Sequence, residues 1–108
     1  IDTAEISTPR DYVTGGITGV YPMVARSRGI KIIYGRFINQ RDLDERRKVL
    51  VISKDNAEVL FNDASKAVGS TVKCMNLAFS IAGVYDDGGR SESYAPFSTV
   101  ENLAGNTG

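Results

Sequence analysis

The sequence predicts an α+β domain in which a small mixed sheet, including one β-hairpin, packs against short helices. Three observations predict this class: four consecutive β-formers at 49–52, a turn dipeptide at 75–76 between two alternating stretches, and apolar residues at helical spacing within 54–61. The 108 residues, 42% of them hydrophobic and 24% charged, are enough to bury one core. A single domain over 1–108 is therefore expected.

Short elements are predicted for the first third of the chain. Residues 1–11 have no clear period and are expected to be a lead-in, either frayed or the end of an element begun upstream. Residues 12–20 alternate apolar with small or polar residues, which predicts one strand loosened by three glycines. A short helix is expected over 21–28 and a strand over 30–34.

A strand and a helix with clear signals follow. Asn39 is a candidate N-cap for a short exposed helix or turn over 39–47, which is too polar to belong to the core. Residues 48–53 read as a strand buried on both faces. Ser53 is a plausible N-cap for the next helix, 54–61, whose apolar residues share one face.

The last third begins with an antiparallel hairpin predicted over 68–74 and 77–85. Two acids and two glycines at 86–89 predict a turn. Residues 94–97 are expected to be a short edge strand, because their proline cannot donate to a ladder. A capping box at 98–101 predicts the start of a last helix toward Gly105.

Composition excludes several classes of function. Thirteen Lys and Arg balance thirteen Asp and Glu, so no long-range field favours nucleic acid as a partner. The absence of His removes the usual general base and the commonest zinc ligand, and the single cysteine rules out an internal disulfide. No cofactor, metal or catalytic residue is predicted. No apolar run approaches the length that spans a bilayer, and the chain reads as a piece of something longer.

Few groupings could carry chemistry. Asp42, Asp44 and Glu45 could hold a hard cation in a small metal-assisted hydrolase, although a solvated charged helix explains them better. Arg36 follows a glycine and could form an anion site; the competing interpretation is that Gly35 ends a strand with an unusual φ while Arg36 pairs with Asp42. Cys74 is expected to be a small hydrophobic residue.

Charge is unevenly placed along the chain. Residues 1–54 hold ten Lys and Arg against six acids, whereas residues 55–108 hold three against seven. The asymmetry can reflect which helix faces are exposed. It can also mark a docking surface for a protein partner, with the candidate residues Arg26, Arg28, Lys31 and Arg36.

An ordered set of short motifs resembles the periplasmic core domain of MacB-type ABC transporter permeases. The match runs over 12–105 and includes G-R-F with a following Asp, V-L-V-I, a lone Gly, F-x-I-x-G-V and P-F-S-T. The residues of this match that we expect to have structural roles are Gly35, Arg36, Phe37, Asp42, Gly69, Phe79, Gly83, Val84 and Pro96. The resemblance implies that the chain is the later part, chiefly one of two α/β lobes, of a domain between the first and second membrane helices.

The resemblance also implies a non-catalytic, mechanical role. Gly35, Gly69 and Gly83 would permit turns or close backbone approach, Phe79 would pack the core, and Pro96 would shape the exit toward the second membrane span. The implied partners are the permease's membrane helices, a second permease copy, a cytoplasmic ATPase domain or subunit, and a possible periplasmic adaptor protein. The alternative hypothesis is a freestanding protein-interaction module that docks through its basic face.

Overall fold

A computed structural model of the protein describes residues 4–86 and 92–105. The strands within these ranges are β1 (Ala4–Ser7), β2 (Tyr12–Gly15), β3 (Ile17–Val20), β4 (Lys31–Gly35), β5 (Val49–Ser53), β6 (Thr71–Cys74), β7 (Leu77–Asp86) and β8 (Ser93–Pro96). The helices are α1 (Val24–Ser27), α2 (Gln40–Asp44), α3 (Lys54–Phe61), the 3₁₀ turn η1 (Ala64–Lys66) and α4 (Phe97–Gly105). This mixture confirms the predicted α+β class.

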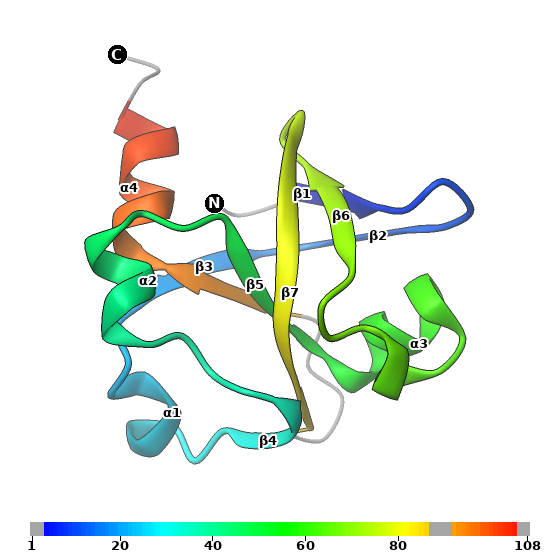
Figure 1. Ribbon diagram of the computed structural model, residues 1–108, viewed down its shortest axis with the longest axis horizontal. Helices are drawn as coiled ribbons and strands as arrows, with labels where there is room; N and C mark the ends of the chain where they lie inside the picture. The colour runs from blue at the N-terminus through cyan, green and yellow to red at the C-terminus, as the bar shows by residue number, and fades with distance from the viewer. Residues whose placement is uncertain (1–3, 87–91, 106–108) are drawn as a thin grey trace.

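All the described strands belong to one curled mixed sheet (Figure 1). Its order is β2-β1-β6-β7-β5-β8-β3, with β4 paired to β7 off this path. Only Gly16 separates β2 from β3, so the two ends of the path are neighbours in the chain. The Ser93 amide donates to the Gly16 carbonyl over 2.9 Å, which ties β8 to this junction. The sheet therefore curls back on itself.

The long strand β7 organises this sheet. Its first half pairs antiparallel with β6, its second half pairs antiparallel with β4, and β5 runs parallel to it along the opposite edge. In Figure 1 β7 crosses the middle of the molecule, with α3 on one side and α2 and α4 on the other. Residues far apart in the sequence thus meet along this one strand.

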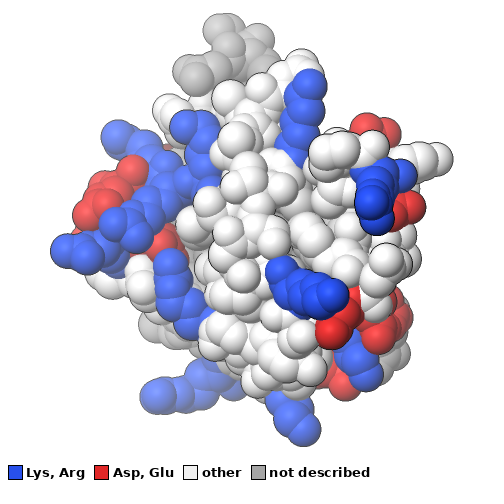
Figure 2. Space-filling view, turned by 45° about the vertical axis from the view of Figure 1, so that its right-hand side comes forward, with Lys and Arg blue, Asp and Glu red and all other residues white. Residues whose placement is uncertain are grey.

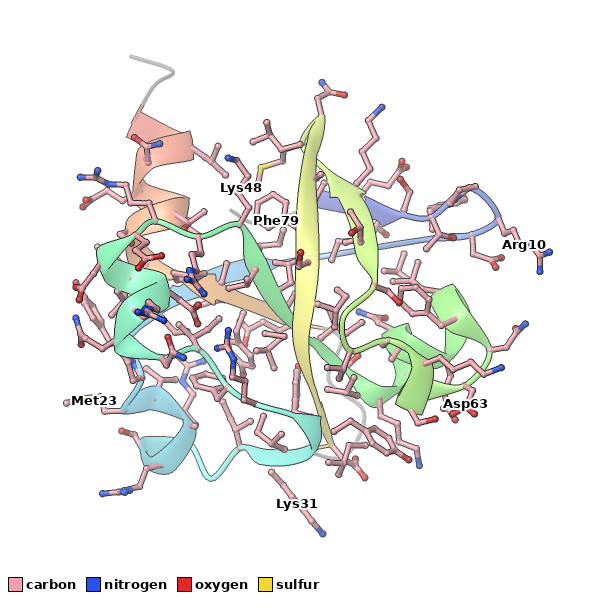
Figure 3. The ribbon with its side chains drawn as sticks, in the orientation of Figure 1. Arg10, Met23, Lys31, Lys48, Asp63 and Phe79 are labelled. Atoms are coloured by element: carbon pink, nitrogen blue, oxygen red, sulfur yellow. The ribbon has the colours of Figure 1, made fainter. Side chains whose placement is uncertain are left out.

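The core has two parts on opposite faces of β5, one containing Leu50 and Ile52 and the other Val49 and Val51. Phe79 is almost wholly buried, and its ring lies beside β7 in Figure 3. Every residue of β5 is buried, as predicted for a strand covered on both faces. A second part of the core contains Tyr85 and Tyr94, whose ring centroids are 5.3 Å apart. The core is thus built mainly from strands that the sequence pattern identified.

Several predictions for the N-terminal third were wrong in detail. The expected lead-in, 1–11, contains β1, which pairs with both β2 and β6. The single strand expected over 12–20 is divided at Gly16, because its two halves pair with different strands. The helix expected over 21–28 is only the single turn α1, since Tyr21 and Pro22 precede it.

The final strand also differs from its prediction. Strand β8 lies between β5 and β3 and is fully buried, so it is not an edge strand. Pro96 is the last residue of β8, in register with Val20 of β3, and β8 meets β5 only through Val51 and Tyr94, so the missing amide affects only the end of the strand. The turn predicted at 86–89 falls mostly outside the described residues.

The predicted capping box was wrong too. Helix α4 begins at Phe97, so Ser98 lies inside its first turn rather than before it. The described residues contain no helix long and apolar enough to cross a membrane.

Candidate functional site

The most tightly built polar site surrounds Asp42 on α2. Its carboxylate is fully buried. It accepts hydrogen bonds from the Arg36 guanidinium at 2.7 and 3.3 Å and from the Asn39 backbone amide at 3.0 Å. An Arg47 guanidinium nitrogen lies 4.0 Å away. The Asn39 side chain in turn accepts from the Asp42 amide, which completes a reciprocal cap at the helix start. We call Arg36, Asn39, Asp42 and Arg47 the Asp42 cluster.

This arrangement decides between the two interpretations of Arg36. Gly35 has a φ of 72°, and Arg36 pairs with Asp42, as the competing interpretation predicted. The guanidinium fork is therefore occupied by a carboxylate of the same chain rather than presented to an outside anion. The prediction that this segment is too polar for the core was wrong, because Asp42 and Leu43 are both buried. Pairing with arginines makes the burial of this carboxylate possible.

The three acids considered for a metal site face different partners. Asp42 faces Arg36, Asp44 accepts from Gln40, and Glu45 contacts arginines on either side of it in the sequence. Within 4–86 and 92–105, no group of three potential ligands is placed to hold a metal ion. Burial raises the pKa of the Cys74 thiol to about 11, which keeps it protonated and weakly nucleophilic. The described residues thus favour structural roles for these groups.

Two glycines allow the motifs that carry Arg36 and Val84 to touch. A Cβ on Gly83 would lie 2.1 Å from the Arg36 carbonyl oxygen, and one on Gly35 would lie 2.3 Å from the Ala82 carbonyl oxygen. The Arg36 amide donates to that same Ala82 oxygen over 3.0 Å. The G-R-F and F-x-I-x-G-V motifs are therefore two sides of one backbone contact.

The remaining motif residues lie on or near the central strands. Phe37 meets the Tyr94 ring edge-on at 5.7 Å, and Val84 is buried on β7. Gly69 has a φ of 87° and donates to the Ile81 carbonyl over 2.9 Å. Pro96 ends β8 immediately before α4. These positions agree with turn and packing functions, and they add no reactive group.

The four candidate docking residues divide into two kinds. Arg36 is engaged by Asp42, and Arg28 lies 3.5 Å from the Glu92 carboxylate. Arg26 and Lys31 form no ion pair with any residue that the structure describes. Lys31 points away from the body of the molecule in Figure 3. In Figure 2, Lys and Arg side chains also project from the lower end of the surface.

Exposed apolar side chains adjoin this basic end. Met23 is 72% exposed and lines, with Arg26, a hollow of about 390 Å³. Tyr21 is half exposed, and its ring stacks on that of Phe97 at 5.0 Å. We call Met23 and Arg26 at α1, together with Lys31 at the start of β4, the basic tip. The sequence did not indicate the contribution of Met23, which precedes α1 as its N-cap residue.

Two polar contacts of α4 were also missed. The Ser98 hydroxyl donates to the Leu43 carbonyl at 2.6 Å, and the Thr99 hydroxyl donates to the Arg47 carbonyl at 2.7 Å. Both carbonyls follow the buried Asp42 on the segment around α2. The hydroxyl-rich start of the last helix was a signal in the sequence, but a local cap explained it equally well.

The fold itself places the protein in a structural class. Its similarity to the periplasmic region of MacB from Actinobacillus actinomycetemcomitans has a TM-score of 0.82 at 24% identity, covering 94% of this chain and 47% of that one. The extracellular domain of the noncanonic ABC-type transporter YknZ from Gram-positive bacteria gives 0.84 at 22%, covering 96% and 55%. The fold is thus that of extracytoplasmic transporter domains.

Sequence comparison then identifies the family. The model of the MacB-like periplasmic core domain matches residues 3–107, so the chain belongs to this family. The macrolide export ATP-binding/permease proteins MacB of Bartonella henselae and Bartonella quintana are each 32% identical over 92 residues. The chain spans 14% of the length of these relatives, and the matches cover 79% of the chain.

Proposed function

We propose that this chain works as part of the extracytoplasmic domain of an ABC transporter permease. In this function it relays ATP-driven motion of the membrane helices to a substrate or a periplasmic partner, and it catalyses no step itself. Membership of the MacB-like periplasmic core domain family is the observation that carries the proposal. The proposed partners are the permease's membrane helices, a second permease copy, a cytoplasmic ATPase domain or subunit and a periplasmic adaptor.

The internal chemistry supports a mechanical function. The most densely bonded polar site in the described part of the chain, the Asp42 cluster, uses its charges to hold its own segments together. A domain that transmits displacement needs such fixed internal contacts, because a loose domain would absorb the motion. The close backbone contact at Gly35 on β4 and Gly83 on β7 supports the same conclusion, since it leaves little room for rearrangement.

Topology in the membrane provides the first test. Asp55 is exposed on α3, whereas Cys74 is only 1% exposed. In the full-length protein in spheroplasts, an Asp55→Cys variant should react with a membrane-impermeant maleimide before lysis as fully as after it. The parent chain, with Cys74 buried, is the matched control for background from this domain. Labelling only after lysis would place the domain on the cytoplasmic side and refute the proposal.

The basic tip is proposed as the docking surface for an acidic segment of the periplasmic partner. The proposal keeps Arg26 and Lys31 from the residues singled out by sequence, since Arg28 and Arg36 already have carboxylate partners. Arg26, which lines a hollow with the exposed Met23, offers both charge complementarity and apolar contact, and Lys31 adds a second cation without an ion pair among the described residues. The freestanding-module hypothesis would use the same surface without a membrane protein around it.

Charge reversal distinguishes specific docking at the basic tip from nonspecific binding. In the full-length transporter, a photocrosslinker at position 23 should yield one adduct with a periplasmic protein, and Arg26→Glu with Lys31→Glu should abolish it. Lys54→Glu, at an exposed position on α3, is the matched control and should leave the adduct unchanged. Persistence of the adduct after reversal at 26 and 31 would exclude the basic tip as the docking surface.

A further inference from the structure

The polar contacts that attach the last helix to the domain lie in its first turn, while Val100 and Leu103 pack against the core. Besides the hydroxyl bonds of Ser98 and Thr99 to the α2 segment, the turn approaches β3 closely at Gly19. A Cβ on Gly19 would be 3.1 Å from the Phe97 Cα. Further along the helix, Glu101 and Asn102 are exposed. In Figure 1 α4 extends from this attachment away from the sheet.

The attachment continues into the Asp42 cluster. The Arg47 carbonyl oxygen accepts a hydrogen bond from the Thr99 hydroxyl, and the Arg47 guanidinium lies 4.0 Å from the Asp42 carboxylate. Asp42 binds Arg36 at 2.7 Å, and the Arg36 amide bonds to the backbone of β7. Each step is a direct contact between named atoms. A continuous set of polar contacts therefore joins α4 to the central strand.

Burial makes these contacts specific. Thr99 is 3% exposed and the Asp42 side chain is inaccessible, so water cannot readily replace the lost partner of either group. The Leu43 carbonyl lies in the short helix α2 and also accepts from the Arg46 backbone amide over 3.2 Å, and the Arg47 carbonyl lies just after the helix. The two hydroxyls reach these carbonyls from a segment more than fifty residues away.

We propose that Ser98 and Thr99 are positioning residues that couple α4 rigidly to the Asp42 cluster, and that displacement of α4 enters the domain through this turn. The inference rests on the proposed relay function and deepens it by naming the coupling residues. Removing both hydroxyls should loosen the coupling of α4 to the α2 segment, leaving only the apolar packing of the helix. Loss of one hydroxyl should increase local opening of α4 by roughly three- to tenfold, as expected for one buried hydrogen bond.

The test uses the full-length transporter with spin labels at exposed positions. A label at Asn102→Cys with one at Asp55→Cys reports the distance from α4 to the far side of the domain, measured with labelled chains diluted among unlabelled ones. A label at position 55 alone reports the distance between the domains of two permease copies. Both distances are measured without nucleotide and with a non-hydrolysable ATP analogue.

In the parent protein, we expect nucleotide to change the distance between copies and to leave the 102-to-55 distance unchanged. In the variant carrying Ser98→Ala and Thr99→Val, the nucleotide-driven change between copies should fall at least twofold, and the 102-to-55 distance should shift or broaden. Thr99→Ser, which keeps the hydroxyl, should restore parent behaviour. Ser70→Ala removes a comparable hydroxyl-to-carbonyl bond, to Lys66, and should change neither distance.

Different outcomes overturn the two proposals. If the parent shows no nucleotide-driven change between copies, the relay function itself is refuted. If the parent shows the change and the Ser98→Ala and Thr99→Val variant shows it undiminished, the coupling role of these hydroxyls is refuted. Should that variant fail to fold, Thr99→Val alone is compared with Thr99→Ser, and equal distance changes in these two would also refute the coupling role.

Discussion

Replacing Gly83 with alanine tests the backbone contact at the centre of the sheet. The added Cβ would lie 2.1 Å from the Arg36 carbonyl oxygen and 2.9 Å from its carbon, both backbone atoms that no rotamer change can move. Strands β4 and β7 would have to separate by more than 1 Å at this point, given an ordinary contact distance of about 3.4 Å or more. We expect the Arg36 segment to be displaced.

Overpacking of this kind costs typically 1–3 kcal/mol, and an immovable neighbour favours the upper end, about 3 kcal/mol. For a chain of this size, each kcal/mol lowers Tm by roughly 4–8 °C, so we expect a decrease of about 12–24 °C. Thermal unfolding followed by circular dichroism measures the change. Urea unfolding of the same variant provides the free energy independently.

Gly29→Ala is the matched control for this variant. Gly29 has a φ of 64° but no atom within 4 Å of the added Cβ, so only backbone strain of about 1 kcal/mol opposes alanine there. The two variants separate the steric contact from general loss of glycine. A Gly83→Ala protein as stable as Gly29→Ala would show that the backbones at 36 and 83 can part freely, which would refute the close-contact argument.

Four further outcomes follow from the site and the core. Arg36→Ala should reduce the free energy of unfolding by about 3–4 kcal/mol, because it leaves the Asp42 carboxylate buried without its partner. Asp42→Ala should reduce it by only about 2 kcal/mol, because it leaves a half-exposed cation. Urea titration of both variants checks this order, and the reverse order would contradict it. Phe79→Ala should cost about 3–5 kcal/mol by the same assay, and a loss below 1 kcal/mol would show that this ring is not central to the core. The raised pKa of Cys74 contributes stability that is fully present below pH 9 and is lost as the pH rises toward about 11. The free energy of unfolding, measured over a pH series, should therefore fall less steeply between these values in Cys74→Ala than in the parent.

Local signals predicted the elements that depend on local chemistry. Helix α3 has the predicted bounds because Ser53 caps its start, with the hydroxyl accepting from the Asn56 amide, and Asn62 ends it with a φ of 66°. The turn at Met75 and Asn76 has positive φ at both residues, as a two-residue hairpin turn requires. In each case the determining contact lies within three residues of the signal.

Long-range partners decided the rest. Strand β1 was missed because its apolar residues gain their environment only when β6, nearly seventy residues later, lies beside it. The placement of β8 depends on β3, and the hydroxyls of Ser98 and Thr99 were assigned to a cap because their carbonyl partners are distant in sequence. The Arg36 to Asp42 pair was predictable because only six residues separate the two charges.

The Asp42 cluster links these two kinds of information. Its capping box is local, yet the cluster joins a helix, two strands and the first turn of α4 through Arg36 and Arg47. A buried carboxylate adds little net stability compared with a well-packed apolar group, so its value lies in geometric specificity. Two arginines directed at one carboxylate fix the relative orientation of the segments that carry them, which apolar packing of equal energy would leave freer to slide. Under the proposed relay function, that property would be needed where a displaced helix is attached, and the cluster contacts the first turn of α4.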